Sequence, residues 1–447
     1  MKPLFILIAA VYCCSNGETR AQGDTTRLTS LENTIATAVK NNPTQEIYLR
    51  QMTQASLNYK AARGFLYPNA SLGFNGTDNL SLATTPIPGV ILGRPGETIY
   101  AKFGKHYVYN TGVSLSQDII SWTSVLEMKL ARSNIALTHL QRAAFLQSLR
   151  EQVTRLYFSA LIAKTALGID AHDRQLADSI VALSQQKLQQ GATDRMSVNL
   201  AAINSYTIAQ NQAQSQQLLD QSIENLKILL GGKPTDEIVV ADSLAGFAGR
   251  DSAMTAPDVP ADAPALGTDR NLVVYRQQQD IAGMQSRSQR SQAYPTITAT
   301  GFFGDQQFRD DFSVAFGNNA WSAYNYVALN ITIPLFTGLT NTYKYRSAVV
   351  QRDIADLQMK KAVEESAIND RLLLKNYAGY WQMLRASAAS FRLYGQNLRL
   401  DQQKYSEGLL PLDVYMKAFE DYLTAETTYL NNLSQLLSIQ ATILSRQ

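Results

Sequence analysis

The chain has 447 residues, of which 45% are apolar and only 17% are charged, well below the quarter of charged residues that is typical of soluble domains. Its formal net charge is +3 and it contains no basic block, so the sequence has no electrostatic footprint for nucleic acid. Gln, Asn, Ser and Thr take the place of much of the missing charge, which predicts a polar but weakly charged surface.

The N-terminal stretch is typical of a secretory signal peptide. Lys2 precedes a short apolar run and small residues follow it, so residues 1–21 are expected to be removed on export. Both cysteines of the chain, Cys13 and Cys14, lie in this stretch, which leaves the exported chain without a thiol, a disulfide or a cysteine-based metal site. A lipid anchor on one of these cysteines is the alternative, although the residue before each is not small.

Long helical patterns follow the signal. A capping box at residues 29–32 predicts the start of a helix, which Asn42-Pro43 interrupts before a second piece runs to about Gly64. Residues 121–190 contain no proline and a single glycine, Gly168, and therefore predict one helix of roughly 100 Å. No later run reaches the roughly 18 apolar residues of a spanning helix, so strands are the remaining way for this chain to cross a membrane.

The longest predicted helix carries the seam of a coiled coil. Apolar residues recur there at alternating spacings of three and four, at Leu146, Leu149, Val153, Leu156, Ala160, Ala163 and Leu167. Such a seam requires a partner helix. Residues 195–230 supply one after a turn that begins at Gly191, because Leu219, Ile223, Leu226 and Leu230 continue the spacing. A flexible break at Gly191 is the alternative to a tight hairpin turn.

The chain then repeats this order of elements. Residues 22–232 form the first predicted repeat, and the proline-rich stretch 233–267 is predicted to be a connector. The second predicted repeat, 268–447, contains a helix at 271–292, a strand pair, a helix at about 340–406, a turn at Gly408 and a last helix from about Leu412. Pro68 of the first repeat corresponds to Pro295 of the second.

Four segments alternate between apolar and polar residues over about ten residues each, the length of a tilted strand that crosses a bilayer. They are residues 67–76 and 107–117 in the first repeat and 294–304 and 324–334 in the second. The residues predicted to face lipid are Val113, Leu115, Val327, Leu329, Ile331 and Ile333. Two soluble hairpins with one buried face are the alternative. The connections at 78–104 and 305–321 are predicted to be outward-facing loops.

Four strands cannot close a barrel, and hydrocarbon tolerates no open sheet edge. Bacterial barrels begin at about eight strands, so a spanning barrel built from this chain must be shared between copies, with two copies supplying about eight strands and three about twelve.

No arrangement of residues points to catalysis. His106, His139 and His172 are widely separated and lack metal-ligand spacing, and no nucleophile motif or phosphate-binding glycine loop occurs. Adjacent carboxylates such as Glu364-Glu365 do not face each other on a helix and are interpreted as surface charge. We therefore expect no enzyme activity, no cofactor and no metal.

Several segments, in this order and with this duplication, carry a family resemblance over essentially the whole mature chain. They are LTSLENTIATAVKNNP, LYPNASL, QQGATDRMSVNLA, AYPTITA, ITIPLFTG and YSEGLLPLDVYMKA. The chain resembles the TolC-like outer-membrane efflux factors. The resemblance implies a mainly α-helical homotrimer, with a long coiled-coil barrel in the periplasm and a 12-stranded β-barrel in outer-membrane lipid, four strands coming from each chain.

The resemblance also implies a function. It implies a passive conduit for drugs, small toxic molecules or, as in type I secretion, proteins, docked to a periplasmic adaptor and an inner-membrane pump of the RND or ABC type. A periplasmic coiled-coil structural or adaptor protein without a pore is the competing interpretation.

At the residue level, the resemblance implies that Gly191, Asp194, Gly408 and Leu410 form helical-hairpin tips that dock the adaptor. It assigns a periplasmic gate to Tyr405 and Asp413, although Asp413 follows Gly408 by five residues where relatives often have six. Capping of the last helix is the alternative role of Asp413. Two further departures are Asp118 in place of a proline at a strand exit and Asp269-Arg270 in place of a second Asn-Pro.

Overall fold

The computed structural model describes residues 25–244, 266, 268–317 and 320–446. The predicted signal peptide and most of the predicted connector lie outside the described residues. The chain divides into two compact units. The sheet unit comprises Ile47–Ala144 and Thr268–Ile368, and the helical unit comprises the described parts of Met1–Glu46, Phe145–Gly267 and Asn369–Gln447.

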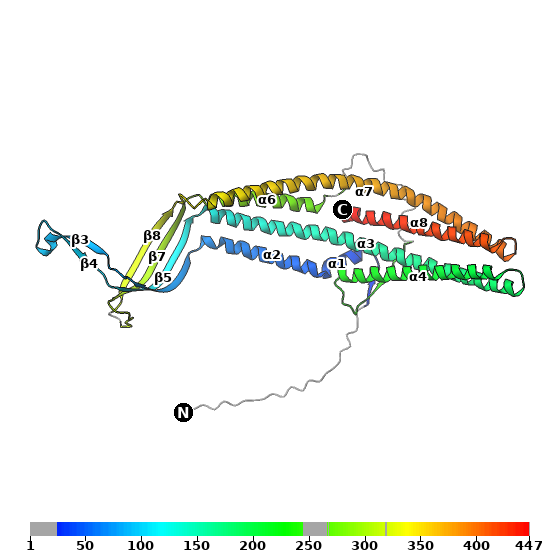
Figure 1. Ribbon diagram of the computed structural model, residues 1–447, viewed down its shortest axis with the longest axis horizontal. Helices are drawn as coiled ribbons and strands as arrows, with labels where there is room; N and C mark the ends of the chain where they lie inside the picture. Colours follow the sequence, from blue (N-terminus) through cyan, green and yellow to red (C-terminus); the bar gives the residue numbers. More distant parts are fainter. Residues whose placement is uncertain (1–24, 245–265, 267, 318–319, 447) are drawn as a thin grey trace, which may run out of the picture. The chain divides into compact units, whose positions relative to one another are not determined.

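The sheet unit contains one antiparallel sheet of four strands in the order β2-β5-β7-β8 (Figure 1). The strands are β2 (Asn69–Asp78), β5 (Tyr107–Ile120), β7 (Thr296–Arg309) and β8 (Ser322–Thr332). Strands β5 and β7 pair over most of their length, with Leu115 opposite Gly301. The two predicted hairpins are therefore not separate, because this pairing joins the two halves of the chain in one sheet.

The strand boundaries differ from the prediction by a few residues. Tyr67 and Tyr294 lie in the turns before β2 and β7, because Pro68 and Pro295 have no N–H to donate to a ladder. Strand β5 runs three residues beyond the predicted end at Gln117, with a bulge between Asp118 and Ile120. Strand β8 ends at Thr332, so the prediction that Ile333 is a strand residue is wrong by one position.

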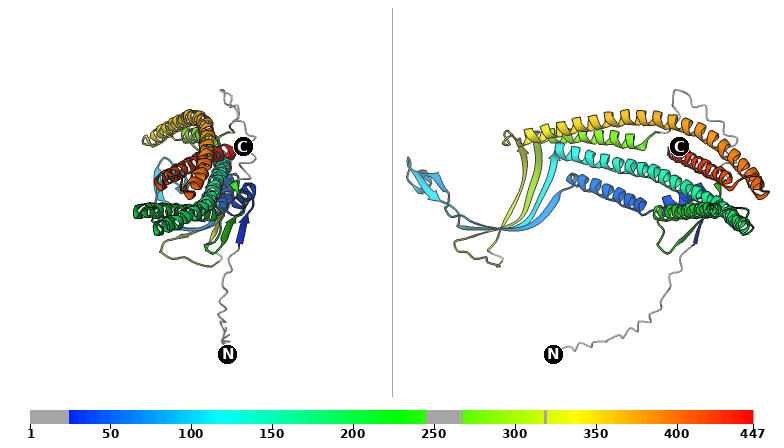
Figure 2. Two further views of the ribbon diagram at one scale, coloured as in Figure 1. Left: turned by 90° about the vertical axis from the view of Figure 1, so that its right-hand side faces the viewer. Right: turned by 45° about the vertical axis from the view of Figure 1, so that its right-hand side comes forward.

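The connection at 78–104, predicted to be an outward-facing loop, contains two strands. Strand β3 (Thr84–Pro88) pairs antiparallel with β4 (Thr98–Lys102), and the 3-10 turn η2 (Gly89–Leu92) lies between them. This hairpin lies beyond the end of the four-stranded sheet (Figure 2). Pro86 and Pro88 argued against a strand in the sequence, because proline cannot donate to a strand ladder. They are tolerated in β3 because one edge of a two-stranded hairpin is unpaired and needs no donor.

Long helices flank these strands in the sequence. They are α1 (Leu31–Asn41), α2 (Pro43–Ala62), α3 (Trp122–Gln189), α4 (Arg195–Leu229), α6 (Arg270–Ser291), α7 (Thr340–Ser406) and α8 (Leu412–Ser445). Ser30 caps α1 by accepting the N–H of Asn33 at 3.2 Å, one residue after the cap at Thr29 that the capping box predicts. Among the described residues, no helix combines the length and the apolar character needed to span a membrane.

The core of the helical unit contains the predicted seam. Leu149, Val153 and Ala160 of α3 are buried in one cluster with Leu226 of α4 and Leu230, the residue that follows α4. The second half of α3 and α4 run side by side in both views (Figures 1 and 2). The prediction that residues 195–230 provide the partner of this seam is therefore confirmed.

Two short strands in the helical unit were not predicted. Strand β1 (Thr25–Leu28) pairs in parallel with β6 (Glu237–Val240), which lies in the stretch predicted to be only a connector. Leu28 and Val240 are buried in the same core cluster as the seam of α3. Four residues are too few for a period-2 pattern to stand out, so the sequence carried little signal for this pairing.

Candidate membrane face and hairpin tips

One face of the four-stranded sheet is apolar and exposed. Residues directly opposite each other in an antiparallel ladder point to the same side. By this register one side, which we call the apolar face, holds Leu72, Phe74, Val113, Leu115, Phe303, Val327, Leu329 and Ile331. Val327 is 76% exposed and Leu329 is 64% exposed. Contiguous exposed apolar surface of this kind marks contact with a membrane or with another protein.

The opposite face of the same sheet, which we call the polar face, carries hydrogen-bonding side chains and also the packed rings of Phe302, Tyr324 and Tyr326. It holds Ser71, Ser114, Ser116, Thr298, Thr300 and Asn330 by the same register. The Asn330 amide donates to the Thr300 hydroxyl at 3.0 Å, and the Thr298 hydroxyl donates to Asp118 at 3.1 Å. The exposed aliphatic side chains of β8 thus lie on one side of the sheet and these side-chain hydrogen bonds on the other. Asp118, which departs from the family's usual proline, takes part in the polar side.

The predicted lipid-facing residues fall on one side of this sheet, with one exception. Val113, Leu115, Val327, Leu329 and Ile331 all lie on the apolar face. Ile333 lies just beyond β8 and is 57% exposed. Contact of these residues with lipid stays a prediction.

The turn between α3 and α4 is closed by Gly191. Its φ of +70° is in the left-handed region, and the N–H of Ala192 bonds back to the carbonyl of Lys187 at 2.8 Å. Asp194 caps α4 by accepting the N–H of Ser197 at 2.8 Å. That backbone hydrogen bond holds the pKa of Asp194 below its usual value.

Gly408 closes the turn between α7 and α8 in the same way. Its φ is +79°, and the N–H of Leu409 bonds to the carbonyl of Lys404 at 2.8 Å. Leu410 is partly buried against the apolar cluster of this hairpin end. Both glycines therefore lie in regular helix-terminating turns, so the alternative of a flexible break at Gly191 is wrong.

Asp413 is exposed in the first turn of α8, where its charge meets the positive end of the helix dipole. Pro411 is the N-cap residue, and no side chain makes a capping hydrogen bond. Asp413 is therefore not the N-cap residue of α8 and makes no capping hydrogen bond. Of the capping alternative, the interaction of its charge with the helix dipole holds. The position of Asp413 two residues inside α8 leaves its carboxylate open to solvent.

Tyr405 ties the end of α7 to α3. The side chain is 3% exposed, and its hydroxyl lies 3.1 Å from the hydroxyl of Ser184. The Lys187 ammonium donates to the Tyr405 carbonyl at 2.7 Å and lies 4.0 Å from the centre of the ring. The ring stacks on Tyr415 of α8 with centroids 5.7 Å apart. Three helices thus meet at this side chain.

Comparison with known proteins gives this architecture a family. The sequence model of the outer membrane efflux proteins matches residues 35–232 and 264–445, well over half of the chain. The chain belongs to the outer membrane efflux protein family. This match confirms the expected resemblance. A search of the curated proteins found no match to the sequence.

Solved structures share the fold of this outer membrane efflux protein at low sequence identity. The CmeC outer membrane channel of Campylobacter jejuni is 17% identical with a TM-score of 0.74, over 99% of this chain and 93% of that one. The open state of the MtrE outer membrane channel of Neisseria gonorrhoeae is 16% identical with a TM-score of 0.73, over 93% and 88%. The outer membrane protein VceC of Vibrio cholerae is 17% identical with a TM-score of 0.67, over 93% of each chain.

These matches confirm the expected fold class, mainly α-helical with a membrane-type antiparallel sheet. The protein is an outer-membrane efflux protein. Members of this family are channels rather than enzymes.

Sequence reasoning missed the partners of Tyr405 in this efflux protein. Ser184 precedes Tyr405 by 221 residues, and such a distance leaves no local signal. A signal did exist on α8, where Tyr415, Phe419 and Tyr422 recur at helical spacing, and Tyr415 and Phe419 are fully buried. That aromatic stripe could have identified the surface on which Tyr405 packs.

Proposed function

We propose that three copies of this chain form a passive conduit from the periplasm to the exterior. The carrying observation is the four-stranded sheet with one apolar face, one polar face and two strands, β2 and β8, at its edges. An edge in hydrocarbon must be paired, and pairing β8 of one copy with β2 of the next closes twelve strands from three chains. The apolar face then meets lipid, and the polar face lines the lumen.

The conduit receives its cargo from other proteins. A periplasmic adaptor docks at the hairpin tips, where Gly191, Asp194, Gly408 and Leu410 lie, and an inner-membrane pump of the RND or ABC type supplies the energy. Drugs, small toxic molecules or secreted proteins are the cargo classes that fit. Support comes from the similarity of this fold to CmeC and MtrE, which are both outer membrane channels.

Membrane fractionation tests this proposal against a soluble periplasmic coiled-coil protein. The conduit predicts resistance to extraction by mild detergent, an oligomer that dissociates on the gel only after heating, and ion conductance in planar bilayers. Release of the full-length protein with the periplasmic contents, without conductance, would instead identify an adaptor-like protein without a pore.

A glycine variant tests the hairpin tips. Gly408→Val places a β-branched side chain at a φ of +79°, which costs roughly 1–3 kcal/mol and distorts the turn. We expect weaker crosslinking to the adaptor and an intact trimer. Gly168→Ala is the matched control, because Gly168 lies inside α3 with open space around it. Loss of the trimer in both Gly408→Val and Gly191→Val would show that the turns serve folding alone.

A further inference from the structure

Three carboxyl groups are buried in the helical unit at some distance from the turns. Asp170 and Asp173 of α3 are 6% and 1% exposed, and Glu426 of α8 is 4% exposed. Among the described residues, no ion pair involves any of the three, although buried carboxylates are costly unless they are neutralised. Packing of α3 against α8 does not by itself require acidic side chains, so these three buried carboxyl groups need an explanation of their own.

The carboxyls of Asp173 on α3 and Glu426 on α8 lie close enough across the contact between these helices for each to shift the pKa of the other. Two buried carboxylates repel each other when both are ionised, so a proton on one of the two groups favours this contact. Asp170 is satisfied differently, because the Ser215 hydroxyl of α4 donates to it at 2.6 Å. Oδ2 of Asp173 and the hydroxyl of Tyr415 are buried and have no hydrogen-bond partner in the described part of the chain.

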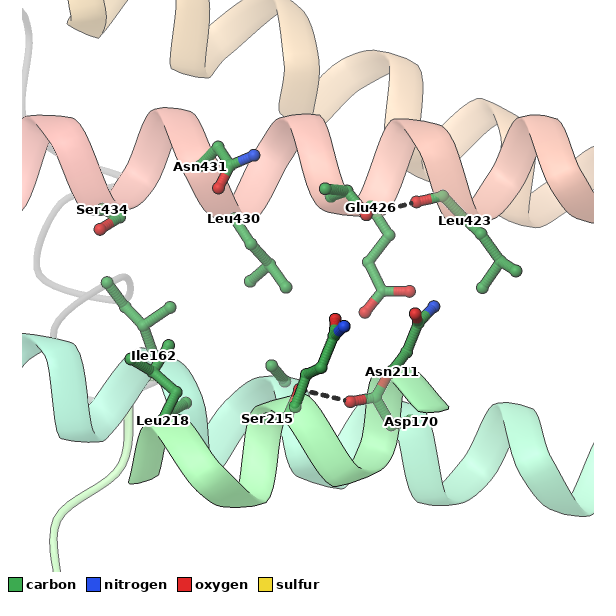
Figure 3. A pocket seen from close by; sticks show the side chains of 14 residues that line it. Ile162, Asp170, Asn211, Ser215, Leu218, Leu423, Glu426, Leu430, Asn431 and Ser434 are labelled. Carbon is green, nitrogen blue, oxygen red and sulfur yellow. Dashed lines mark hydrogen bonds between the residues drawn. The ribbon is translucent and has the colours of Figure 1, made fainter. Parts of the chain in front are cut away.

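A cavity of about 340 Å³ gives this cluster access to water. Glu426 points into it from α8, while Asp170 and Ser215 face it from α3 and α4 (Figure 3). Asn211, Asn431 and Ser434 also line it, and their amide and hydroxyl groups can hold ordered water. No lysine or arginine lines this cavity. The cavity therefore contains no fixed positive charge that would stabilise the ionised form of Glu426 in place of a proton.

The electrostatics of the surrounding groups favour a retained proton. Burial, together with the carboxyls of Asp173 and Asp170, raises the pKa of Glu426 to about 8. The pKa of Asp173 is raised to about 6, mainly by burial. The charge of His172 lowers this pKa, and the charge of Asp170 raises it. The hydroxyl of Tyr422 on α8 lowers the pKa of Asp173, and the charge of Arg399 on α7 lowers the pKa of Tyr422. At neutral pH Asp173 is therefore ionised while Glu426 is protonated.

We propose that Asp173 and Glu426 form a proton-binding site that couples the packing of α8 on α3 to the pH of the periplasm. One proton shared by the two carboxyls lets the helices pack, and its release leaves two like charges in contact and loosens them. This site is separate from the hairpin turns, and it does not depend on whether the protein conducts.

The sign of the effect follows from the raised pKa values. Between the ordinary pKa of a glutamate, about 4.3, and the raised value of Glu426 the folded protein binds more protons than the unfolded chain, so stability falls as pH rises. The stabilising contribution is complete below about pH 4 and is lost as pH rises through about 8.

Two measurements on the full-length protein test the site. Infrared difference spectroscopy of the wild type should show a protonated carboxyl at about pH 6 that disappears by about pH 9. The melting temperature should fall over the same interval, and Glu426→Gln should remove most of this fall and melt above the wild type at about pH 9. Glu420→Gln, an exposed change on the same helix, is the matched control and should keep the wild-type pH dependence.

Either of two results would overturn the proposal. The first is a wild-type spectrum without a protonated carboxyl at about pH 6, which needs no variant and holds even if Glu426→Gln fails to fold. The second is equal pH dependence of melting in Glu426→Gln and the wild type. A melting temperature that responds to added Mg²⁺ and not to pH would identify a cation in place of the proton and would also contradict it.

Discussion

Leu329→Arg is expected to destabilise the membrane-inserted protein by about 2–4 kcal/mol, the cost of an arginine on the lipid face of a barrel strand near mid-membrane depth. Leu329 is 64% exposed on the apolar face, three residues inside the end of β8. Ile331 lies on the same face but only one residue from that end, so Ile331→Arg should cost less, towards about 1 kcal/mol.

Asn330→Arg is the matched control for this series. Asn330 neighbours both positions in sequence but belongs to the polar face, where its amide bonds Thr300. We expect a change below about 1 kcal/mol there, because the arginine would lie in water. The free energy of unfolding from lipid vesicles by denaturant titration measures all three. Equal losses at positions 329 and 330 would remove the assignment of the apolar face to lipid.

Tyr405→Phe is expected to raise single-channel conductance by favouring the open state. The variant removes the hydroxyl that bonds Ser184 while it keeps the stacking of the ring on Tyr415. A buried hydrogen bond contributes about 1 kcal/mol, which corresponds to roughly a fivefold shift between closed and open states. Tyr394→Phe, a half-exposed change on the same helix, should leave conductance unchanged.

Asp413→Asn tests the second part of the proposed gate. Threefold symmetry would place three Asp413 carboxylates around the lumen, a ring that favours cations. We expect lower cation selectivity in planar bilayers, together with a small stability loss of about 0.3–1 kcal/mol from the helix dipole. If neither Tyr405→Phe nor Asp413→Asn changes conductance or selectivity, the gate lies elsewhere in the chain.

The sequence alone was sufficient for the features that depend on neighbouring residues. The long helix α3, the turns at Gly191 and Gly408 and the apolar alternation of β8 follow from helical periodicity, from the left-handed conformation that glycine allows and from the period of two in a strand. Prolines at 68 and 295 marked both strand entries, with errors of only a few residues at the ends.

Only the tertiary structure decided which distant segments meet. The pairing of β5 with β7, the contact of Tyr405 with Ser184 and the carboxyl pair of Asp173 and Glu426 each join residues that are far apart in the chain. Local propensity carries no information about such partners, because their contacts form only when packing brings two helices or strands together. In the sequence alone, a buried acidic residue of a helix cannot be distinguished from an exposed one. Only the packing of the opposing helix reveals its partners.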